Sequence, residues 1–201
     1  DGKEMKIDRR GLLGAIAAGS AGMAAPRAFA AVRSGGQPAL LARALARLDA
    51  HGRALLHRDR IGLVDFSMPS RIPRFDIVDL AGGRTIATHL VAHGRGSDPA
   101  NTGWTGRLSN QPGSNASCRG SFLTASAYHG RHGRSRRLIG LDPDNSNAAS
   151  RAIVIHAADY VSGAMAQRHG RVGRSQGCFA VPDREIAEVM ALLGEGRLLF
   201  A

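Results

Sequence analysis

Short apolar runs separated by glycine and proline dominate the chain beyond residue 60. Each run is four to eight residues long and rich in alternating or β-branched side chains, which is typical of strands rather than helices. The runs lie at 61–66, 75–80, 84–91, 121–126, 137–141, 152–156 and 197–200. A Gly82-Gly83 pair between the second and third runs predicts a tight hairpin. A chain with this pattern is expected to fold as a mainly β domain.

Helical spacing of apolar residues appears only near the two ends of this β region. Leucine and alanine recur with a helical period over 39–56, with arginines on the opposite side. Pro182 suits the first turn of a second, shorter helix that runs to residue 193. Between these ends, residues 94–118 are rich in Gly, Pro, Asn and Ser, which predicts a long functional loop. A length of 201 residues suits one domain with a full core.

The first thirty residues have the composition of an export signal. Arg9-Arg10 precede a short apolar stretch of Ala and Gly, and the segment closes on Ala28-Phe29-Ala30. Paired arginines, a short apolar core and an A-x-A site predict a cleavable twin-arginine-like signal over 1–30. The alternative is an amphipathic helix that stays on the mature protein. We therefore expect an exported protein of the periplasm or cell wall, without stable membrane insertion after the signal is removed.

The net charge of the chain limits the classes of partner that it is expected to bind. The formal net charge is +11, and every basic residue beyond residue 30 is an arginine rather than a lysine. A basic surface favours polyanions, such as nucleic acid or the carboxylate-rich wall of a bacterium. The arginines are scattered and are not interleaved with stacking aromatic residues, which argues against nucleic acid.

A cysteine on a glycine turn and an upstream histidine are the candidate catalytic pair. Cys178 follows Gly177, and His156 ends the apolar run 152–156, whose alternation sends it to the face opposite the core. A reactive thiolate needs a base or positive charge beside it. Nearby in sequence, positive charge is available from Arg171, Arg174 and His169. The N–H groups of Gly177 and Cys178 are expected to stabilise an oxyanion.

Two other roles for these residue types remain open. In an exported protein, Cys118 and Cys178 would by default form a disulfide. A metal site could use His129 and His132, whose spacing fits one helical turn, together with His93. Glycines at 130 and 133 argue against a helix there, so we expect no metal.

Several blocks between residues 91 and 182 resemble, in the same order, the murein L,D-transpeptidase catalytic domain family, a branch of the YkuD-like cysteine transpeptidases. The blocks are 91–97, 108–110, 113–114, 128–133, 138–141, 151–160 and 173–182. The resemblance covers roughly residues 60–200 and implies a single β-sandwich-like domain around a Cys–His site. The domain organisation would then be an export signal over 1–30, a helical extension over 31–59 and a catalytic domain over 60–201.

The resemblance also implies roles for individual residues. Cys178 would be the nucleophile, His156 the base, and the backbone carbonyl of Ala157 the group that orients the histidine ring. The family usually has Ser/Thr-His-Gly-Cys at its nucleophile, whereas this chain has Gln176 before Gly177. Glutamine can form hydrogen bonds but carries no charge. Residues 160–173 would form an insertion between the two catalytic blocks.

The implied reaction is the cross-linking of peptidoglycan stem peptides with release of D-alanine, without a cofactor, in an enzyme that carbapenems target. A lipoprotein could replace the second stem as acceptor. Candidate stem-binding residues are Ser175, Arg174, Gln176, Tyr160, Asn110 and His93. For four of these residues the alternative role is a loop-stabilising hydrogen bond: Arg174, Tyr160, Asn110 and His93. Rival functions are an L,D-carboxypeptidase or other wall cysteine peptidase, and a wall-binding module without catalysis.

Overall fold

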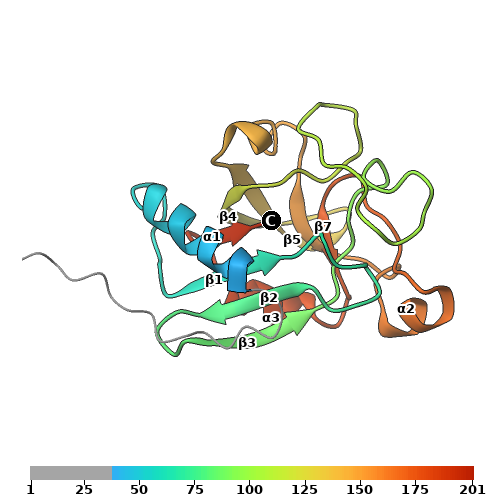
Figure 1. The fold of residues 1–201 in the computed structure, drawn as a ribbon, viewed down its shortest axis with the longest axis horizontal. Helices are drawn as coiled ribbons and strands as arrows, with labels where there is room; N and C mark the ends of the chain where they lie inside the picture. Colours follow the sequence, from blue (N-terminus) through green and yellow to red (C-terminus); the bar gives the residue numbers. More distant parts are fainter. Residues whose placement is uncertain (1–37) are drawn as a thin grey trace, which may run out of the picture.

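The computed structural model describes residues 38–201, which form one mixed eight-stranded sheet with three α-helices (Figure 1). In chain order the elements are α1 (Pro38–Ala50), β1 (Arg60–Val64), β2 (Phe75–Asp79), β3 (Arg84–His89), β4 (Ser121–Gly130), β5 (Gly133–Gly140), a 3₁₀ turn (Pro143–Asn145), β6 (Val154–Ala157), α2 (Gly163–His169), β7 (Phe179–Val181), α3 (Ile186–Leu192) and β8 (Leu198–Phe200). The prediction of a mainly β single domain is confirmed. The predicted export signal lies outside the described residues.

The sheet curves so that its two outer strands approach each other. The strands are ordered β3-β2-β1-β8-β4-β5-β6-β7, with parallel pairing of β1 with β8 and of β6 with β7. Just after β3, the backbone N–H of Ala92 donates to the carbonyl of Ala180 in β7, at 2.9 Å. One face of the curved sheet therefore encloses a core, as in the expected β-sandwich-like arrangement.

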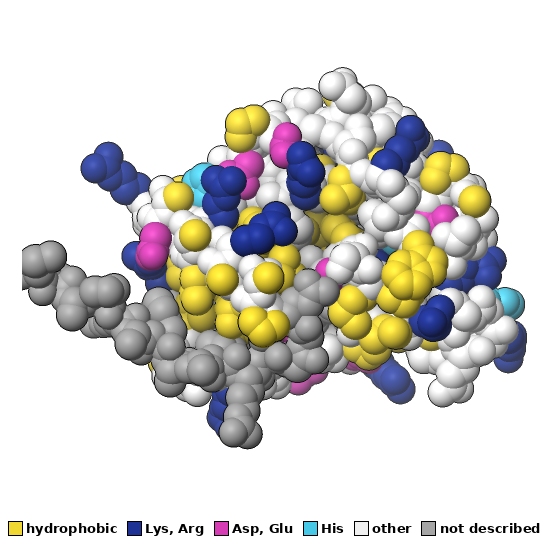
Figure 2. All heavy atoms as spheres, viewed as in Figure 1, with side chains coloured by type: hydrophobic (Ala, Val, Ile, Leu, Met, Phe, Trp, Pro, Cys, Tyr) yellow, Lys and Arg dark blue, Asp and Glu magenta, His cyan; other side chains and the backbone are white. Residues whose placement is uncertain are grey.

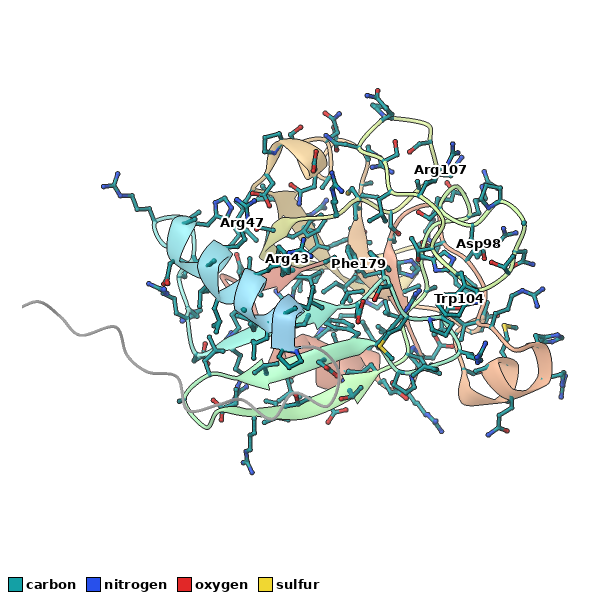
Figure 3. The ribbon with its side chains drawn as sticks, in the orientation of Figure 1. Arg43, Arg47, Asp98, Trp104, Arg107 and Phe179 are labelled. Atoms are coloured by element: carbon teal, nitrogen blue, oxygen red, sulfur yellow. The ribbon has the colours of Figure 1, made fainter. Side chains whose placement is uncertain are left out.

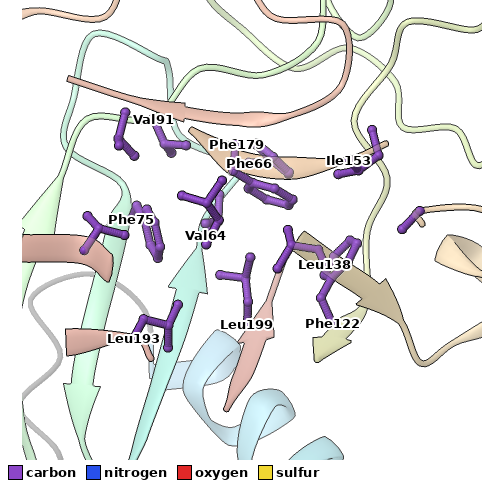
Figure 4. Packing of buried hydrophobic residues seen from close by; sticks show 14 of the residues in the cluster. Val64, Phe66, Phe75, Val91, Phe122, Leu138, Ile153, Phe179, Leu193 and Leu199 are labelled. Carbon is purple, nitrogen blue, oxygen red and sulfur yellow. The ribbon is translucent and has the colours of Figure 1, made fainter. Parts of the chain in front are cut away.

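The core lies on the enclosed face of the sheet. Side chains from both halves of the sheet pack there in one cluster (Figure 4), which includes Val64, Phe75, Phe122, Leu138, Ile155, Phe179 and Leu199. Gly62 faces this cluster, and a Cβ at that position would lie 2.8 Å from the Leu193 and Leu199 side chains. Close packing thus explains a glycine in the middle of β1.

Helix α1 covers the opposite face of the sheet, in front of the strands in Figure 1. Its buried residues Leu41, Ala44 and Leu48 follow helical spacing. They pack against Ile61, Leu63, Val78, Leu80, Leu198 and Phe200. Alternate residues of β1 therefore contact α1 and the enclosed core, as strand geometry requires. The predicted helix over 39–56 is real but ends earlier, at Ala50.

The region around the candidate cysteine contains two elements that the apolar pattern did not predict. Helix α2 is only seven residues long, too short for a clear period. The Ser162 Oγ caps it by accepting from the Met165 N–H, and Gly170 ends it with φ +65°. Strand β7 follows Cys178 directly. Helix α3 begins at Ile186 rather than Pro182, after a turn closed by the Glu185 N–H.

Within residues 38–201, no helix has both the length and the apolar character needed to cross a bilayer.

Candidate active site

The parallel pairing of β6 with β7 brings Cys178 and His156 to one face of the sheet. Ile155 pairs with Phe179 and His156 with Ala180, so Cys178 lies one residue before the paired region of β7. Ile155 and Phe179 point into the core. Because strand side chains alternate, Cys178 and His156 both point to the other face, as the sequence predicted for His156. The half-buried Cys178 Sγ–H donates to the Ala152 carbonyl at 3.5 Å.

The surroundings of His156 favour the neutral form of its ring. Its Nδ1 lies 2.7 Å from the Ala157 carbonyl oxygen, which can only accept, so Nδ1 carries the proton. The remaining nitrogen, Nε2, is then the one that can take a proton. Burial, with 2% of the residue exposed, lowers the pKa of His156, and the Ala157 carbonyl partly offsets this. The expected contact between this carbonyl and the ring is present.

The turn before Cys178 is built from Ser175 and Gly177. Gly177 has φ +119°, a conformation that favours glycine. The Ser175 Oγ donates to the Cys178 carbonyl at 2.7 Å and accepts from the Gly177 N–H at 3.1 Å. Ser175, which was expected to bind substrate, is also buried, and its hydroxyl is engaged in shaping the turn. The Gly177 N–H, one of the two expected oxyanion donors, is thus engaged by the Ser175 hydroxyl.

The positive charge near Cys178 comes from arginines that sequence proximity did not indicate. Burial raises the pKa of the Cys178 thiol, while a hydrogen bond from the Val154 N–H and the charges of Arg131 and Arg151 lower it. Arg151 donates to the Ser109 carbonyl at 2.7 Å and to the Ala116 carbonyl, behind the turn. Arg174 instead donates to the carbonyls of Asp98 and Pro99.

The other candidate stem-binding residues differ in their exposure and in the hydrogen bonds that they already make. Tyr160 is half-buried, and burial together with the nearby Cys178 raises its pKa to about 12, so its hydroxyl stays protonated. Gln176 is exposed beside the nucleophile. The Asn110 amide donates to the Pro143 carbonyl and the Ser146 Oγ, both at 3.0 Å. Asn110 therefore anchors the long loop, which was the alternative to substrate binding.

His93 is buried, with 1% of the residue exposed. Arg74 Nη2 donates to its Nδ1 at 2.7 Å, and its Nε2 lies 3.4 Å from the Asp98 carboxylate. Burial and the Arg74 charge lower its pKa to about 4, so it is neutral at neutral pH. His93, which was expected to bind substrate, is thus engaged within the protein. It joins the residue before β2, Arg74, to Asp98 of the long loop.

This buried neutral histidine makes the fold sensitive to acid. An unfolded histidine titrates near 6.5, so protonation favours the unfolded chain as the pH falls from about 6.5 toward about 4. This difference in pKa corresponds to about 3 kcal/mol of folding stability. That stability is fully present above the unfolded pKa and is lost as the pH falls toward the folded pKa. Urea unfolding of wild type and His93→Gln, followed from about pH 7 to about pH 4, should show a shallower acid loss in the variant. His57→Gln, at an exposed position, should retain the wild-type slope; equal slopes in all three proteins would contradict the assignment.

Two hollows open on the face shown in Figure 2, where apolar side chains lie between arginines. The first, of about 450 Å³, is lined by residues that include Phe66, Arg107, Leu108 and Asn110. The second, of about 430 Å³, lies against α1, and Figure 3 labels its Arg43 and Arg47. They share Arg119 and Asp144, which form an ion pair at 2.8 Å. Neither Cys178 nor His156 lines them, so they are separate from the candidate catalytic pair.

The structure also bears on the two other roles considered for these residues, a Cys118–Cys178 disulfide and a histidine metal site. Both cysteines are free thiols, and Cys118 is buried in the core, so the disulfide is not formed. In the part of the chain that the structure describes, no three His, Cys, Asp or Glu side chains are grouped to hold a metal. His132 instead stacks on His156.

A family model described as "L,D-transpeptidase catalytic domain" matches residues 33–201. Solved structures similar to this chain include an L,D-transpeptidase from Mycobacterium smegmatis (12% identity, TM-score 0.44) and LD transpeptidase LdtMt1 in complex with imipenem (14%, 0.44). Another is an L,D-transpeptidase from Mycobacterium tuberculosis H37Rv (15%, 0.40). Each match covers 71% of this chain, which spans 58%, 58% and 57% of those chains respectively. No curated protein matches significantly.

Proposed function

Because this chain belongs to the family of L,D-transpeptidase catalytic domains, we propose that it cross-links peptidoglycan through an acyl-enzyme on Cys178. One observation carries the proposal. The β6–β7 register turns Cys178 and His156 to the same face, and the Ala157 carbonyl leaves only Nε2 of His156 to act as a base. The reaction class comes from the family, and the geometry supports Cys178 and His156 as the catalytic residues.

In the first half-reaction, His156 Nε2 takes the proton from the Cys178 Sγ. The sulfur attacks the carbonyl carbon that joins an L-centre to D-alanine in a tetrapeptide stem. The Cys178 N–H stabilises the oxyanion that forms. The carbon–nitrogen bond then breaks, His156 returns its proton to the departing amine, and D-alanine leaves. The stem remains bound to the enzyme as a thioester.

In the second half-reaction, an amine of another stem attacks the thioester carbon. His156 takes a proton from the attacking amine, the new peptide bond forms, and the sulfur leaves as a thiolate that regains its proton from His156. A lipoprotein amine could follow the same route. Water in place of the amine would make the chain an L,D-carboxypeptidase.

Three candidate residues remain for binding the stem. Tyr160 offers a protonated hydroxyl near Cys178, and Gln176 is exposed beside it. Arg174, half-buried and bonded to loop carbonyls, would act by its charge and by shaping the loop. Arg131 and Arg151 favour the thiolate electrostatically. Since LdtMt1 is known in complex with imipenem, we further propose that carbapenems acylate Cys178 here.

The proposed substrate lies outside the cytoplasm, so the chain must be exported. We propose that residues 1–30 act as a twin-arginine-like signal. The helical extension over 31–59 and the catalytic domain over 60–201 would then make up the protein in the periplasm or wall.

The test is the product formed from purified disaccharide-tetrapeptide. Incubation with the chain should release D-alanine and yield cross-linked dimers, both measured by liquid chromatography and mass spectrometry. Tripeptide products without dimers would favour the carboxypeptidase. Neither product, from folded protein that still binds isolated wall, would contradict the proposal and favour a binding module.

A further inference from the structure

The outer face of the His156 ring is covered by a second histidine. Gly130 pairs with Gly133, so Arg131 and His132 form the two-residue tip of the β4–β5 hairpin. The His132 and His156 ring centroids are 4.3 Å apart, with 26° between the ring planes. His132 is exposed, whereas His156 is buried. The His132 ring therefore lies between His156 and solvent.

Arg131 orients this covering ring through a hydrogen bond. Its Nε–H donates to His132 Nε2 at 2.9 Å. A guanidinium nitrogen can only donate, so His132 Nε2 accepts in this contact. The hairpin tip thus holds the His132 ring against His156.

The charged groups around His156 come from two segments. Burial lowers its pKa, the Ala157 carbonyl raises it, His132 and Arg131 lower it, and Asp183, which follows β7, raises it. On the paired strands, its backbone neighbours are Ser135 and Ala180, neither of which is charged. The hairpin tip is therefore the segment that favours the neutral ring, which is the form a general base requires.

We propose that His132 is a positioning residue for His156, whose ring it holds in one orientation and shields from water. The catalytic consequence rests on the proposed function, whereas the effect on His156 itself does not. Stacking restricts rotation of the His156 ring, and the covering ring keeps water away from it.

The experiment compares wild type with His132→Ala and His132→Phe. His129→Ala is the matched control, because His129 is an exposed histidine on the same hairpin. The titration of the His156 ring is followed by NMR of its carbon-bound protons. In parallel, the rate of imipenem addition to Cys178 is measured as a function of pH by intact mass. Thermal unfolding shows that each variant is folded.

In His132→Ala, the His156 titration and the acid limb of the rate profile should both move to higher pH, because the burial that lowers the His156 pKa is reduced. The rate at neutral pH should fall roughly ten-fold, as expected when a base is less well oriented. His132→Phe retains a stacked ring and should recover most of the rate. His129→Ala should match wild type in both measurements.

Two results separate this inference from the proposed function. An unchanged His156 titration in folded His132→Ala would overturn the positioning role and leave His132 as a turn residue. A shifted titration together with no imipenem adduct on any variant would support the positioning role while contradicting the acyl-transfer function.

Discussion

Replacing Cys178 with alanine is expected to abolish the covalent adduct that wild type forms with imipenem. The sulfur attacks the lactam carbonyl carbon and the ring carbon–nitrogen bond breaks, but the nitrogen stays attached to the adduct. The wild-type mass should therefore rise by the full mass of imipenem. Alanine has no nucleophilic atom in its side chain, so no acyl bond can form at this position. Intact mass spectrometry measures the effect, which is all or none.

The second cysteine of the chain provides the matched control. Cys118 is 1% exposed, and burial raises the pKa of its thiol, so it should not react. Cys118→Ala should therefore keep the adduct. Because both thiols are free, the adduct should form with or without reductant. An adduct that appears only after reduction would reveal a disulfide in solution. Its absence from wild type under reducing conditions would count against Cys178 as the nucleophile.

Local patterns predicted the parts of this molecule that depend on sequence neighbours. The strand runs and the Gly82-Gly83 hairpin were foreseeable because alternation and turn residues act over a few positions. The face on which His156 lies also followed from alternation within β6. The Ala157 carbonyl beside the His156 ring came from the family resemblance, and the structure contains that contact.

Contacts between distant segments could not be predicted in this way. The charges that lower the Cys178 pKa come from Arg131 at a hairpin tip and Arg151 in the turn before β6, whereas sequence proximity had pointed to Arg171 and Arg174. His93 has a polar side chain that suggested a surface role. Its burial depends on Arg74 and Asp98, which neither spacing nor composition links to it. Only the folded chain shows which polar residues are already engaged with one another.

The position of Cys178 depends on contacts that Gly177, the residue before it, makes with distant segments. The Ser117 Oγ, from the end of the long loop, donates to the Gly177 carbonyl at 3.1 Å. A Cβ on Gly177 would lie 2.7 Å from the Ala116 carbonyl oxygen and 2.8 Å from Ile153 Cδ1. The turn is thus packed between the loop and the segment that leads into β6, with no room for a side chain.

Gly177→Ala is accordingly expected to disrupt the site as well as the fold. The φ of +119° would be strained for alanine, and the clash must push the turn away from Ala116. We expect a loss of about 3 kcal/mol in the free energy of unfolding, measured in urea. Imipenem addition should slow at least roughly a hundred-fold, because displacing the sulfur by a fraction of an ångström misaligns it with its base.

Gly113→Ala isolates the contribution of backbone strain from that of the clash. Gly113 also has a positive φ, of +74°, but a Cβ there would meet nothing within 4 Å. Its substitution should cost about 1 kcal/mol of stability and leave the rate of imipenem addition near that of wild type. If Gly177→Ala behaved like Gly113→Ala in both measurements, the turn would be able to relax, and the tight packing would not be what positions Cys178. A large loss in Gly177→Ala alone would show that the contacts of Ala116 and Ile153 hold the nucleophile in place.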